Sequence, residues 1–381
     1  MQENKIKKAV VTGGAGFIGS NMVDRLVDMG VQVTVIDNLS TGKRENINSA
    51  AYFWEQDLVT AEVETISEYL EDVDAVFHFA AMARVQPSIE DPVMFNEHNV
   101  TATLKLLKAC ADSKVKRFVL SSSSSIYGDA EVMPTSEELP RNPMSPYAAQ
   151  KMICEDYCKL FSDVYGLDTV CLRYFNVYGD RMTREGAYCT VLGIWAGQVE
   201  EGKNITITND GEQRRDFTYV GDVVNANLLS ATHTDKLNGG VYNVGNSDNV
   251  TINELAVLFE HHTNSHVEYI GDRLEPKATL ADISKIKNKL GWKPNGDVKK
   301  WVKNFVKELK NGSEKTTTKT VELEYELWDM VSYGHGEPLV PFSLICRDER
   351  FEFVNSVGHR SKFKDSRIRF VDRVGNSSFE E

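Results

Sequence analysis

The sequence predicts an α/β protein built on a Rossmann-type, doubly wound parallel sheet. Short apolar runs at residues 8–12, 31–36, 75–79, 117–120 and 169–172 suit buried strands. Stretches with helical spacing lie between them, at residues 17–29, 92–110 and 147–165. Strands that alternate with helices are typical of a parallel sheet with helices on both faces.

A glycine-rich turn lies inside the first strand–helix–strand unit. Gly13, Gly16 and Gly19 follow the first strand and open the first helix. Such glycines allow a tight turn, a close approach of the backbone to a pyrophosphate, and close packing of the helix on the strand. The phosphates then lie at the positive end of the helix dipole. The loop predicts dinucleotide binding, with a purely structural turn as the alternative.

The second strand is followed by an acidic residue, Asp37. A carboxylate at this place suits the 2′-hydroxyl of the adenosine ribose and repels a 2′-phosphate. The sequence therefore favours NAD over NADP as the cofactor.

Tyr147 and Lys151 are four residues apart on one predicted helix. This spacing brings a phenol and an ammonium to one helix face. A fixed cation favours the phenolate, which lets a tyrosine act as a base near neutral pH. The pair is a common coincidence by itself, and it gains meaning from its place after the fifth strand of a dinucleotide fold.

The remaining chain is less regular and predicts further domains. Helices are expected at residues 187–199, 222–231, 252–261, 283–290 and 298–309, and strands at residues 205–207, 217–220 and 241–244. We expect an NAD-binding domain over residues 1–175, to which 217–245 return, and a smaller mixed α/β substrate domain from 176–216 and 246–310. The chain changes texture near residues 311–313, and Thr316–Thr318 has the polarity of a linker. Residues 311–381 form a β-rich C-terminal extension with strands expected at 321–327, 350–354 and 367–371.

Composition excludes several classes of function. The net charge of −13 argues against a nucleic-acid partner, which needs clustered Lys and Arg. No apolar run approaches the ~20 residues of a membrane helix, and no signal peptide is recognised. The six cysteines form no disulfide framework or CxxC pair, so buried reduced thiols and a cytoplasmic location are expected rather than a metal or redox role. His78 and His98 lack metal-ligand spacing, and no metal site is predicted.

The sequence resembles the extended short-chain dehydrogenase/reductase family, and within it the nucleotide-sugar epimerases, over about residues 6–310. The motifs that carry the resemblance are TGGAGFIG at 12–19, DL at 57–58, HFAA at 78–81, SSSSSIY at 121–127, SPYAAQK at 145–151, LRYFNVYG at 172–179, RDF at 215–217 and LAD at 280–282. The resemblance implies that Tyr147 is the base, that Lys151 binds the nicotinamide ribose and lowers the tyrosine pKa, and that Ser123 hydrogen-bonds the reacting oxygen.

The resemblance also implies a set of cofactor and substrate residues. Those expected to bind NAD are Gly13, Gly16, Phe17, Ile18, Gly19, Asp37, Asn38, Ser40, Thr41, Gly42, Asp57, Leu58, Phe79, Ala80, Ala81, Asn99, Ser121, Tyr147, Lys151 and Tyr174. Those expected to bind the nucleotide sugar are Ser123, Asn176, Val191, Arg215, Arg273, Glu275 and Thr279. Asp57 and Leu58 would flank the adenine. The chain departs from the family's usual Arg-x-Gly-Asp, since Arg273 and Glu275 match it only with a one-residue deletion.

One substitution bears on the reaction. The family's dehydratases and decarboxylases carry an acid two residues before Tyr127, where this chain has Ser125, preceded by Ser124. Without that carboxylate, the resemblance implies a 4-epimerase that oxidises C4 transiently and returns the hydride. The small Thr279 leaves room for an N-acetyl group, unless it is an ordinary loop residue. This favours UDP-N-acetylglucosamine and UDP-N-acetylgalactosamine, with UDP-glucose and UDP-galactose also possible.

Other functions stay open. They are UDP-glucuronate 4-epimerisation, another nucleotide-sugar dehydratase or reductase, and a non-catalytic NAD-binding protein. The helices at 92–110 and 147–165 pair across a two-fold interface in the family, which implies a homodimer. The extension at 311–381 has no recognised counterpart and is an appendage, an oligomer contact or a partner module.

Overall fold

The computed structural model describes residues 6–184, 189–271 and 275–317, and three strands between residues 342 and 363. The chain forms two compact units, Met1–Leu309 and Lys310–Glu381. None of the helices in these ranges combines the length and the apolar character that a membrane crossing requires.

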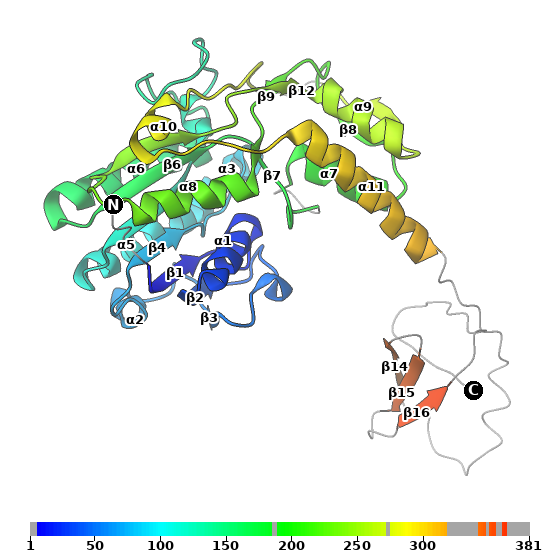
Figure 1. Ribbon diagram of the computed structural model, residues 1–381, viewed down its shortest axis with the longest axis horizontal. Helices are drawn as coiled ribbons and strands as arrows, with labels where there is room; N and C mark the ends of the chain where they lie inside the picture. The colour runs from blue at the N-terminus through cyan, green and yellow to red at the C-terminus, as the bar shows by residue number, and fades with distance from the viewer. Residues whose placement is uncertain are drawn as a thin grey trace. The chain divides into compact units, whose positions relative to one another are not determined.

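A parallel sheet of seven strands forms the centre of the first unit (Figure 1). Its strands are β1 (Lys8–Thr12), β2 (Gln32–Asp37), β3 (Tyr52–Glu55), β4 (Ala75–His78), β5 (Arg117–Ser123), β6 (Thr169–Tyr174) and β11 (Gly240–Val244). They lie in the order β11-β6-β5-β4-β1-β2-β3, so the chain winds outward from β1 in both directions. The predicted doubly wound parallel sheet is confirmed.

The edge strand β3 was not predicted. Its two end residues are exposed and its two central residues are half-buried, so it lacks the fully buried apolar run of a central strand. Its stability comes from tertiary contacts, among them the ring of Trp54, which stacks on Tyr69 with centroids 4.0 Å apart.

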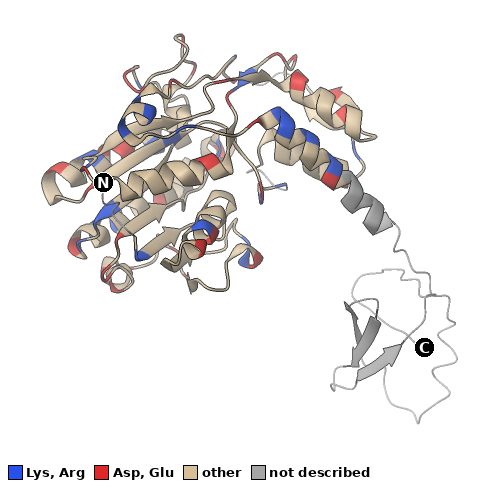
Figure 2. Ribbon diagram, in the orientation of Figure 1, with Lys and Arg blue, Asp and Glu red and all other residues tan. Residues whose placement is uncertain are grey.

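Helices cover both faces of the sheet (Figure 1). One core contains side chains of α1 (Phe17–Asp28) and α8 (Val220–Thr232). The other contains side chains of α2 (Val63–Glu68), α5 (Ala102–Asp112) and α6 (Pro146–Leu160). Acidic and basic residues both occur on α1, α5 and α6, whereas α2 and α8 carry acidic residues only (Figure 2).

Alternation along each strand builds these two cores. In β4, Ala75 and Phe77 belong to the core under α1, whereas Val76 belongs to the core under α5. In β1, Val11 likewise belongs to the core under α1 and Val10 to the core under α5. Successive side chains of a strand point to opposite faces, so a strand covered on both faces must be apolar throughout.

The two long predicted helices contain local changes of helical type. The stretch predicted at 92–110 consists of α4 (Pro92–Asn96), a π-helical turn η2 (Glu97–Thr101) and α5. The stretch predicted at 147–165 consists of α6 and a second π-helical turn, η4 (Phe161–Tyr165). Just before α4 lies the short α3 (Val85–Glu90).

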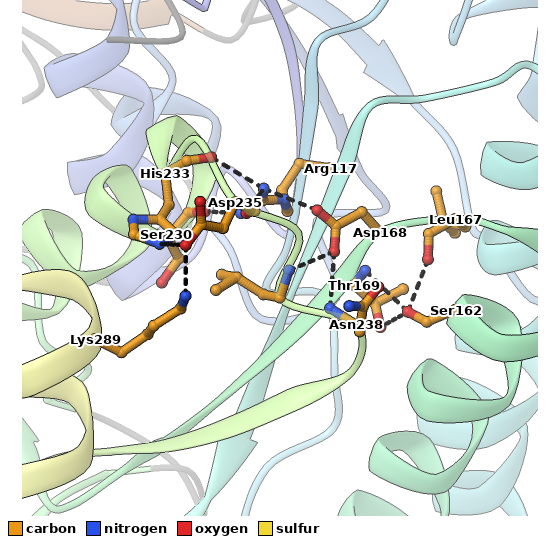
Figure 3. Close-up of polar contacts among 11 residues, drawn as sticks. Arg117, Ser162, Leu167, Asp168, Thr169, Ser230, His233, Asp235, Asn238 and Lys289 are labelled. Carbon is orange, nitrogen blue, oxygen red and sulfur yellow. Dashed lines mark hydrogen bonds and ion pairs between the residues drawn. The ribbon is translucent and has the colours of Figure 1, made fainter. Parts of the chain in front are cut away.

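A buried polar cluster joins three strands at the amino edge of the sheet (Figure 3). Arg117 at the start of β5 forms an ion pair of 2.8 Å with Asp168, which precedes β6. Asp168 also accepts the N–H groups of Leu237 and Asn238, which lead into β11, at 2.8 and 2.9 Å. Because both charges are nearly fully buried, losing one partner would leave the other unpaired in the protein interior. The cluster therefore fixes the amino ends of β5, β6 and β11.

A third core lies beneath a smaller layer of helices and short strands. The helices are α7 (Val191–Glu200), α9 (Ile252–His262) and α11 (Val298–Thr317), with α10 (Ser284–Leu290) packed on the main sheet. The short strands pair as β7 (Val177–Tyr178) with β10 (Thr218–Tyr219), β9 (Arg214–Arg215) with β12 (Val250–Thr251), and β8 (Ile205–Ile207) with β13 (Val267–Tyr269). The rings of Trp195 and Phe259 meet edge-on in this core at 5.2 Å.

Two predicted boundaries differ from the structure by more than three residues. Helix α7 begins at Val191, after the N-cap Thr190, rather than at residue 187. Helix α11 runs past the predicted end at Leu309 to Thr317, so the linker expected at Thr316–Thr318 is wrong for its first two residues. A single glycine, Gly312, costs a helix only about 1 kcal/mol relative to alanine, too little to end it here.

The second unit contains an antiparallel three-stranded sheet. Its strands are β14 (Phe342–Arg347), β15 (Arg350–Asn355) and β16 (Arg360–Phe363). The strand predicted at 350–354 is confirmed by β15. The strands predicted at 321–327 and 367–371 lie outside the described residues. The division into an NAD-binding and a substrate domain remains a prediction.

His78 predicts a pH-dependent stability. It is 2% exposed, and its two ring nitrogens lie 2.6 and 2.8 Å from the hydroxyls of Thr12 and Thr103. Burial, and secondarily the charge of Lys151, lower its pKa to about 3. Since the unfolded histidine titrates near pH ~6.5, the unfolded state binds the extra proton, so stability is full above that pH and falls as the pH drops.

We therefore expect wild-type protein to lose about 2 kcal/mol more of its unfolding free energy between about pH 7 and pH 5 than the His78→Gln variant loses. Urea denaturation of both proteins at the two pH values measures this difference. Equal losses in both proteins would contradict it.

Candidate active site

A cleft lies at the carboxyl edge of the sheet, where β1, β2, β4 and β5 end. All but two of the predicted cofactor residues line it: Gly13, Gly16, Phe17, Ile18, Gly19, Asp37, Asn38, Ser40, Thr41, Asp57, Leu58, Phe79, Ala80, Ala81, Ser121, Tyr147, Lys151 and Tyr174. Doubly wound sheets bind their ligands at this edge, beside the strand where the order reverses.

The glycine loop comes directly after β1 and packs closely against other backbone atoms. Gly13 has a positive φ of 69°, and a Cβ atom on it would lie 2.6 Å from the amide nitrogen of Ala80. A Cβ atom on Gly19 would lie 2.1 Å from the carbonyl oxygen of Gly13. No side chain caps α1 at its N-cap residue Gly16, so N–H groups of the first turn remain for an anion.

Asp37 stands at the end of β2, beside the loop. Its carboxylate accepts the N–H groups of Ala15 at 3.0 Å and Leu39 at 2.8 Å. Burial raises its pKa above the ordinary value, and these two hydrogen bonds oppose the rise. A carboxylate keeps further lone pairs after two hydrogen bonds, so Asp37 can still accept a ribose hydroxyl.

Helix α6 brings Tyr147 and Lys151 to the cleft. The helix begins there because the hydroxyl of Ser145 accepts the N–H of Ala148 at 3.2 Å and Pro146 occupies the first turn. The ammonium of Lys151 is 6.0 Å from the centre of the Tyr147 ring. It donates to the carbonyl oxygen of Ser121 at 2.8 Å.

Lys151 is a buried cation, 5% exposed. Within the described ranges, no carboxylate comes within 4 Å of its ammonium. A buried charge is expensive unless it is paired or hydrogen-bonded. The ammonium thus keeps donors for a ligand hydroxyl or a phenolate in the cleft.

Tyr174 lines the cleft but is held by neighbouring polar groups. Its hydroxyl lies 3.2 Å from the hydroxyl of Ser121 and 2.9 Å from the amide nitrogen of Asn227. Burial raises its pKa to about 12, against the effect of these hydrogen bonds. This tyrosine is therefore a neutral wall of the cleft rather than a base.

Ser123 does not line the cleft as described, although Ser121 and Ser122 do. Its hydroxyl oxygen accepts the N–H of Ser125 at 3.2 Å and the hydroxyl of Ser125 at 2.9 Å. With both lone pairs occupied, the proton of Ser123 is the one that remains to donate.

Ser122 belongs to a buried network instead. Its hydroxyl donates to Glu155 at 2.6 Å, and Arg173 forms a two-pronged ion pair with the same carboxylate at 2.8 and 2.6 Å. The guanidinium of Arg173 lies 4.7 Å from the centre of the Tyr127 ring. Glu155 follows Lys151 by one turn of α6, so the network ties this helix to β5 and β6.

Asn99 and Gly42, the two exceptions, lie behind the cleft. The side chain of Asn99 is 1% exposed; it accepts the N–H of Met82 at 2.8 Å and donates to the carbonyl of Met82 at 2.9 Å and to Gln150 at 2.9 Å. A Cβ atom on Gly42 would lie 2.7 Å from that of Ala15. Both residues support segments that line the cleft, and their contact with the cofactor stays a prediction.

The predicted substrate residues form a second group outside this cleft. The side chain of Asn176 donates to the hydroxyl of Thr279 at 3.3 Å. Arg215 forms an ion pair of 2.5 Å with Glu275. The carbonyl of Arg214 joins the two pairs, since it accepts the N–H of Thr279 and the guanidinium of Arg215, each at 3.0 Å.

Besides Ser123, described above, two further predicted substrate residues are not part of this group. Val191 packs against the third core as the first residue of α7. Arg273 lies outside the described residues. Arg215 is 8% exposed, so its charge is held close to Glu275 in a nearly buried position.

Asp216, next to Arg215, is fully buried and holds this region together. Its carboxylate accepts the N–H groups of Asn246 at 2.6 Å, Ser247 at 3.1 Å and Ala281 at 2.9 Å. Burial raises its pKa to about 6, although the three hydrogen bonds act in the opposite direction.

Several residues of the cleft were not predicted: Ile36, Gln56, Met82, Ala83, His98, Ala102, Ser122 and Thr183. Gln56, Met82 and Ala83 directly adjoin predicted residues, so extending each motif by one or two positions would have found them. His98, Ala102 and Thr183 come from helices or loops that only the fold brings to the cleft.

The two histidines considered for a metal have other partners. His78 bonds to two threonines, and His98 lies between Met94 and Asp57. Over the ranges the structure describes, no group of three or more His, Cys, Asp or Glu side chains could hold a metal ion.

Comparison with known proteins identifies the family. Residues 9–245 match the model of the NAD dependent epimerase/dehydratase family. A UDP-glucose 4-epimerase of Lactobacillus helveticus is 34% identical over 305 residues, which cover 75% of this chain and 92% of that protein. The chain belongs to the NAD-dependent epimerase/dehydratase family.

Solved structures of the family have the same fold. A UDP-N-acetylglucosamine 4-epimerase from Methanobrevibacter ruminantium M1, in complex with UDP-N-acetylmuramic acid, is 41% identical, with a TM-score of 0.75. The match covers 81% of this chain and 99% of that one. The UDP-glucose 4-epimerase of Thermus thermophilus, in complex with NAD, is 34% identical, with a TM-score of 0.72, over 80% and 99% of the two chains. This protein is thus an NAD-dependent enzyme of the epimerase type.

The residues present fit NAD. Gly13 and Gly19 stand where a Cβ atom would collide with neighbouring backbone, N–H groups of α1 are left for the pyrophosphate, and Asp37 would serve as an acceptor for a ribose. The buried ammonium of Lys151 would serve the second ribose as a donor; it bonds to the end of β5, whereas Asp57 follows β3 on the other side of β1.

The glycine loop yields a test of the cofactor site. We expect Gly19→Ala to weaken NAD binding at least tenfold, because its methyl group must displace the carbonyl of Gly13. Gly30→Ala is the control: its Cβ atom meets nothing within 4 Å, and its positive φ costs about 1 kcal/mol of stability without reaching the cleft.

Isothermal titration with NAD measures both variants, and thermal unfolding checks that they fold. Unchanged NAD affinity in folded Gly19→Ala protein would contradict the assignment of this loop.

Proposed function

We propose that the protein is a UDP-sugar 4-epimerase, and that its preferred pair is UDP-N-acetylglucosamine and UDP-N-acetylgalactosamine. The observation that carries the proposal is the meeting of Tyr147, Lys151 and the glycine loop in one cleft, next to a serine run that lacks a carboxylate at Ser124 and Ser125. The names of the relatives, UDP-glucose and UDP-N-acetylglucosamine 4-epimerases, support it.

In the proposed reaction, Tyr147 removes the proton of the C4 hydroxyl. The ammonium of Lys151, anchored on the carbonyl of Ser121, favours the phenolate that does so. The proton of Ser123, free of its neighbours, donates to the oxygen at C4. Bound NAD supplies the acceptor and donor for the hydride at C4. Tyr147 then returns its proton after the sugar has presented its other face.

Elimination of water is disfavoured because the needed acid is missing. Proton removal at C5 and protonation of a leaving hydroxyl need a base and an acid near the ring in addition to Tyr147. Ser124 and Ser125 offer hydroxyls at the positions where the family's dehydratases carry acids.

Tyr147→Phe tests the reaction. We expect turnover to fall by roughly 10²–10⁴-fold or more, because the base is lost, while NAD binding survives since the ring remains. The assay is NMR with UDP-glucose, UDP-N-acetylglucosamine and UDP-glucuronate offered separately to wild type and variant. Tyr52→Phe, exposed on the edge strand β3 and outside the cleft, is the control and keeps full activity.

Three outcomes would overturn the proposal. A 4-keto-6-deoxy product would indicate a dehydratase, and release of NADH with an oxidised sugar would indicate a net dehydrogenase. No turnover of any sugar despite bound NAD would indicate a binding protein.

The preference for N-acetyl sugars rests on Thr279. This small residue is half-buried beside Asn176, and its hydroxyl accepts the N–H of Asp216 at 3.1 Å. We expect Thr279→Tyr to lower kcat/KM for UDP-N-acetylglucosamine at least tenfold relative to UDP-glucose.

Thr279→Ser keeps the hydroxyl and its hydrogen bonds, so it serves as the control and keeps the wild-type ratio. Steady-state kinetics with both sugars measures the ratio. A Tyr variant with an unchanged ratio would remove Thr279 from the determinants of specificity.

We further propose a homodimer formed by the helical stretches at residues 92–110 (α4, η2 and α5) and 147–165 (α6 and η4). Exposed apolar side chains gather on these helices and their neighbours: Val85, Ile89, Val93, Ile153, Leu160, Val164 and Tyr165. Contiguous exposed apolar surface favours a protein–protein contact.

The cytoplasmic location stays a prediction, supported by five free and buried cysteines.

A further inference from the structure

Ser88 contacts the backbone of the proposed base from outside the cleft. It lies fully buried in the short helix α3 and does not belong to the described lining of the cleft. Its hydroxyl oxygen accepts the N–H of Tyr147 at 3.1 Å. The same hydroxyl donates its hydrogen to the carbonyl oxygen of Val85 at 2.6 Å. One side chain therefore joins the first turn of α6 to the first residue of α3.

The backbone of α6 does not supply this acceptor. The N–H groups in the first turn of a helix have no carbonyl partner within that helix. Ala148 donates instead to the N-cap hydroxyl of Ser145 at 3.2 Å, and Ala149 is far enough along to donate to the carbonyl of Ser145 at 3.0 Å. The N–H of Tyr147 precedes both, and its acceptor comes from another element of the fold.

Helix α3 leads directly away from the wall of the cleft. Residues 79–83 line the cleft, and α3 begins two residues later at Val85. Between them, Arg84 has a φ of 103°, a conformation that side chains other than glycine rarely adopt. Such a conformation persists only where surrounding contacts hold it, and the bond from Ser88 to Val85 is one of these contacts. Ser88 thus holds this turn and Tyr147 in a fixed relation.

A second contact joins the same two parts of the chain. Gln150, 4% exposed on α6, donates to the carbonyl of Pro92 at 3.2 Å and accepts the side-chain amide of Asn99 at 2.9 Å. Pro92 opens α4, the helix that follows α3. The side chain of Gln150 can adjust by rotating about its own bonds, whereas the Ser88 contact acts on the backbone of Tyr147 itself. The position of the tyrosine backbone therefore depends more directly on Ser88.

A small shift of this backbone would reach the reacting atoms. Proton transfer requires the phenol oxygen to come within about 2.6–3.2 Å of the hydroxyl that it deprotonates. A misplacement of ~1 Å can cost a catalytic step about 100-fold. The side chains of Lys151 and Glu155 hold the later turns of α6 to β5, so loss of the Ser88 hydroxyl would act on the first turn, where Tyr147 stands.

We propose that Ser88 is a positioning residue for the reaction. Its hydroxyl holds the backbone of Tyr147 to the turn that follows the cleft wall, and so sets the reach of the phenol toward the hydroxyl of the sugar. This inference rests on the proposed role of Tyr147 as the base. It is separate from cofactor binding, which the glycine loop, Asp37 and Lys151 serve.

Three variants test the hydroxyl. Ser88→Ala removes it and keeps α3 helical, since alanine is the best helix former. Ser88→Thr restores a hydroxyl on the same carbon atom. Ser67→Ala is the matched control, because Ser67 is a half-buried helical serine whose hydroxyl donates to the carbonyl of Val63 at 2.8 Å, away from the described lining of the cleft.

The measurement is steady-state epimerisation of the UDP-sugar that wild type converts best, followed by NMR, with kcat expressed per bound NAD. Thermal unfolding checks that each variant is folded at the assay temperature. We expect Ser88→Ala to lower kcat about tenfold, while KM and NAD affinity change by less than about twofold. Ser88→Thr should recover most of kcat, and Ser67→Ala should keep all of it. A merely structural role would lower the number of NAD-loaded sites and leave the turnover of each site unchanged.

Several results would contradict the role of Ser88. Unchanged turnover per bound NAD in Ser88→Ala would show that the contact does not place the phenol. Equal losses of kcat in the Ala and Thr variants would show that the hydroxyl is not the group responsible. A wild-type protein that converts none of the UDP-sugars would overturn the proposed function, and this inference with it, so the two failures are told apart by the wild-type arm.

Discussion

The hydrogen bond from the ammonium of Lys151 to the carbonyl of Ser121 is the contact on which the position of Tyr147 in the cleft depends. It joins α6 to the carboxyl end of β5 at 2.8 Å in a buried position. One helical turn earlier on the same face stands Tyr147, and one turn later Glu155 closes a buried network with Ser122 and Arg173. The phenol is therefore placed by a helix that is held to the sheet at two successive turns.

A second buried polar contact holds the other end of β5. Arg117 and Asp168 join the amino ends of β5, β6 and β11, about one strand length from the cleft (Figure 3). Since both ends of β5 are held by buried polar contacts, the serine run at its carboxyl end has little freedom to shift. Such contacts cost desolvation energy and contribute mainly through the geometry that they specify.

Local sequence patterns predicted the parts of the molecule whose structure depends on residues close together in the sequence. The apolar runs of β1, β4 and β5 are buried on both faces and so are visible without the fold. Edge strand β3 and the extension of α11 to Thr317 were missed, because one depends on stacking by Tyr69 and the other overrides a local glycine. Asn99 was expected to touch the cofactor, yet its side chain is bonded to Met82 and Gln150.

The sequence by itself determined the cofactor and the pair Tyr147 and Lys151, because glycine spacing and an i, i+4 pair act within one turn or one helix. Only the tertiary structure decided that Arg215 is held by Glu275, that Asp57 faces His98, and that Ser125 occupies the lone pairs of Ser123. These contacts are decided by packing and by the satisfaction of buried polar groups. The partners come from separate elements, or depend on a turn whose shape the surrounding fold imposes.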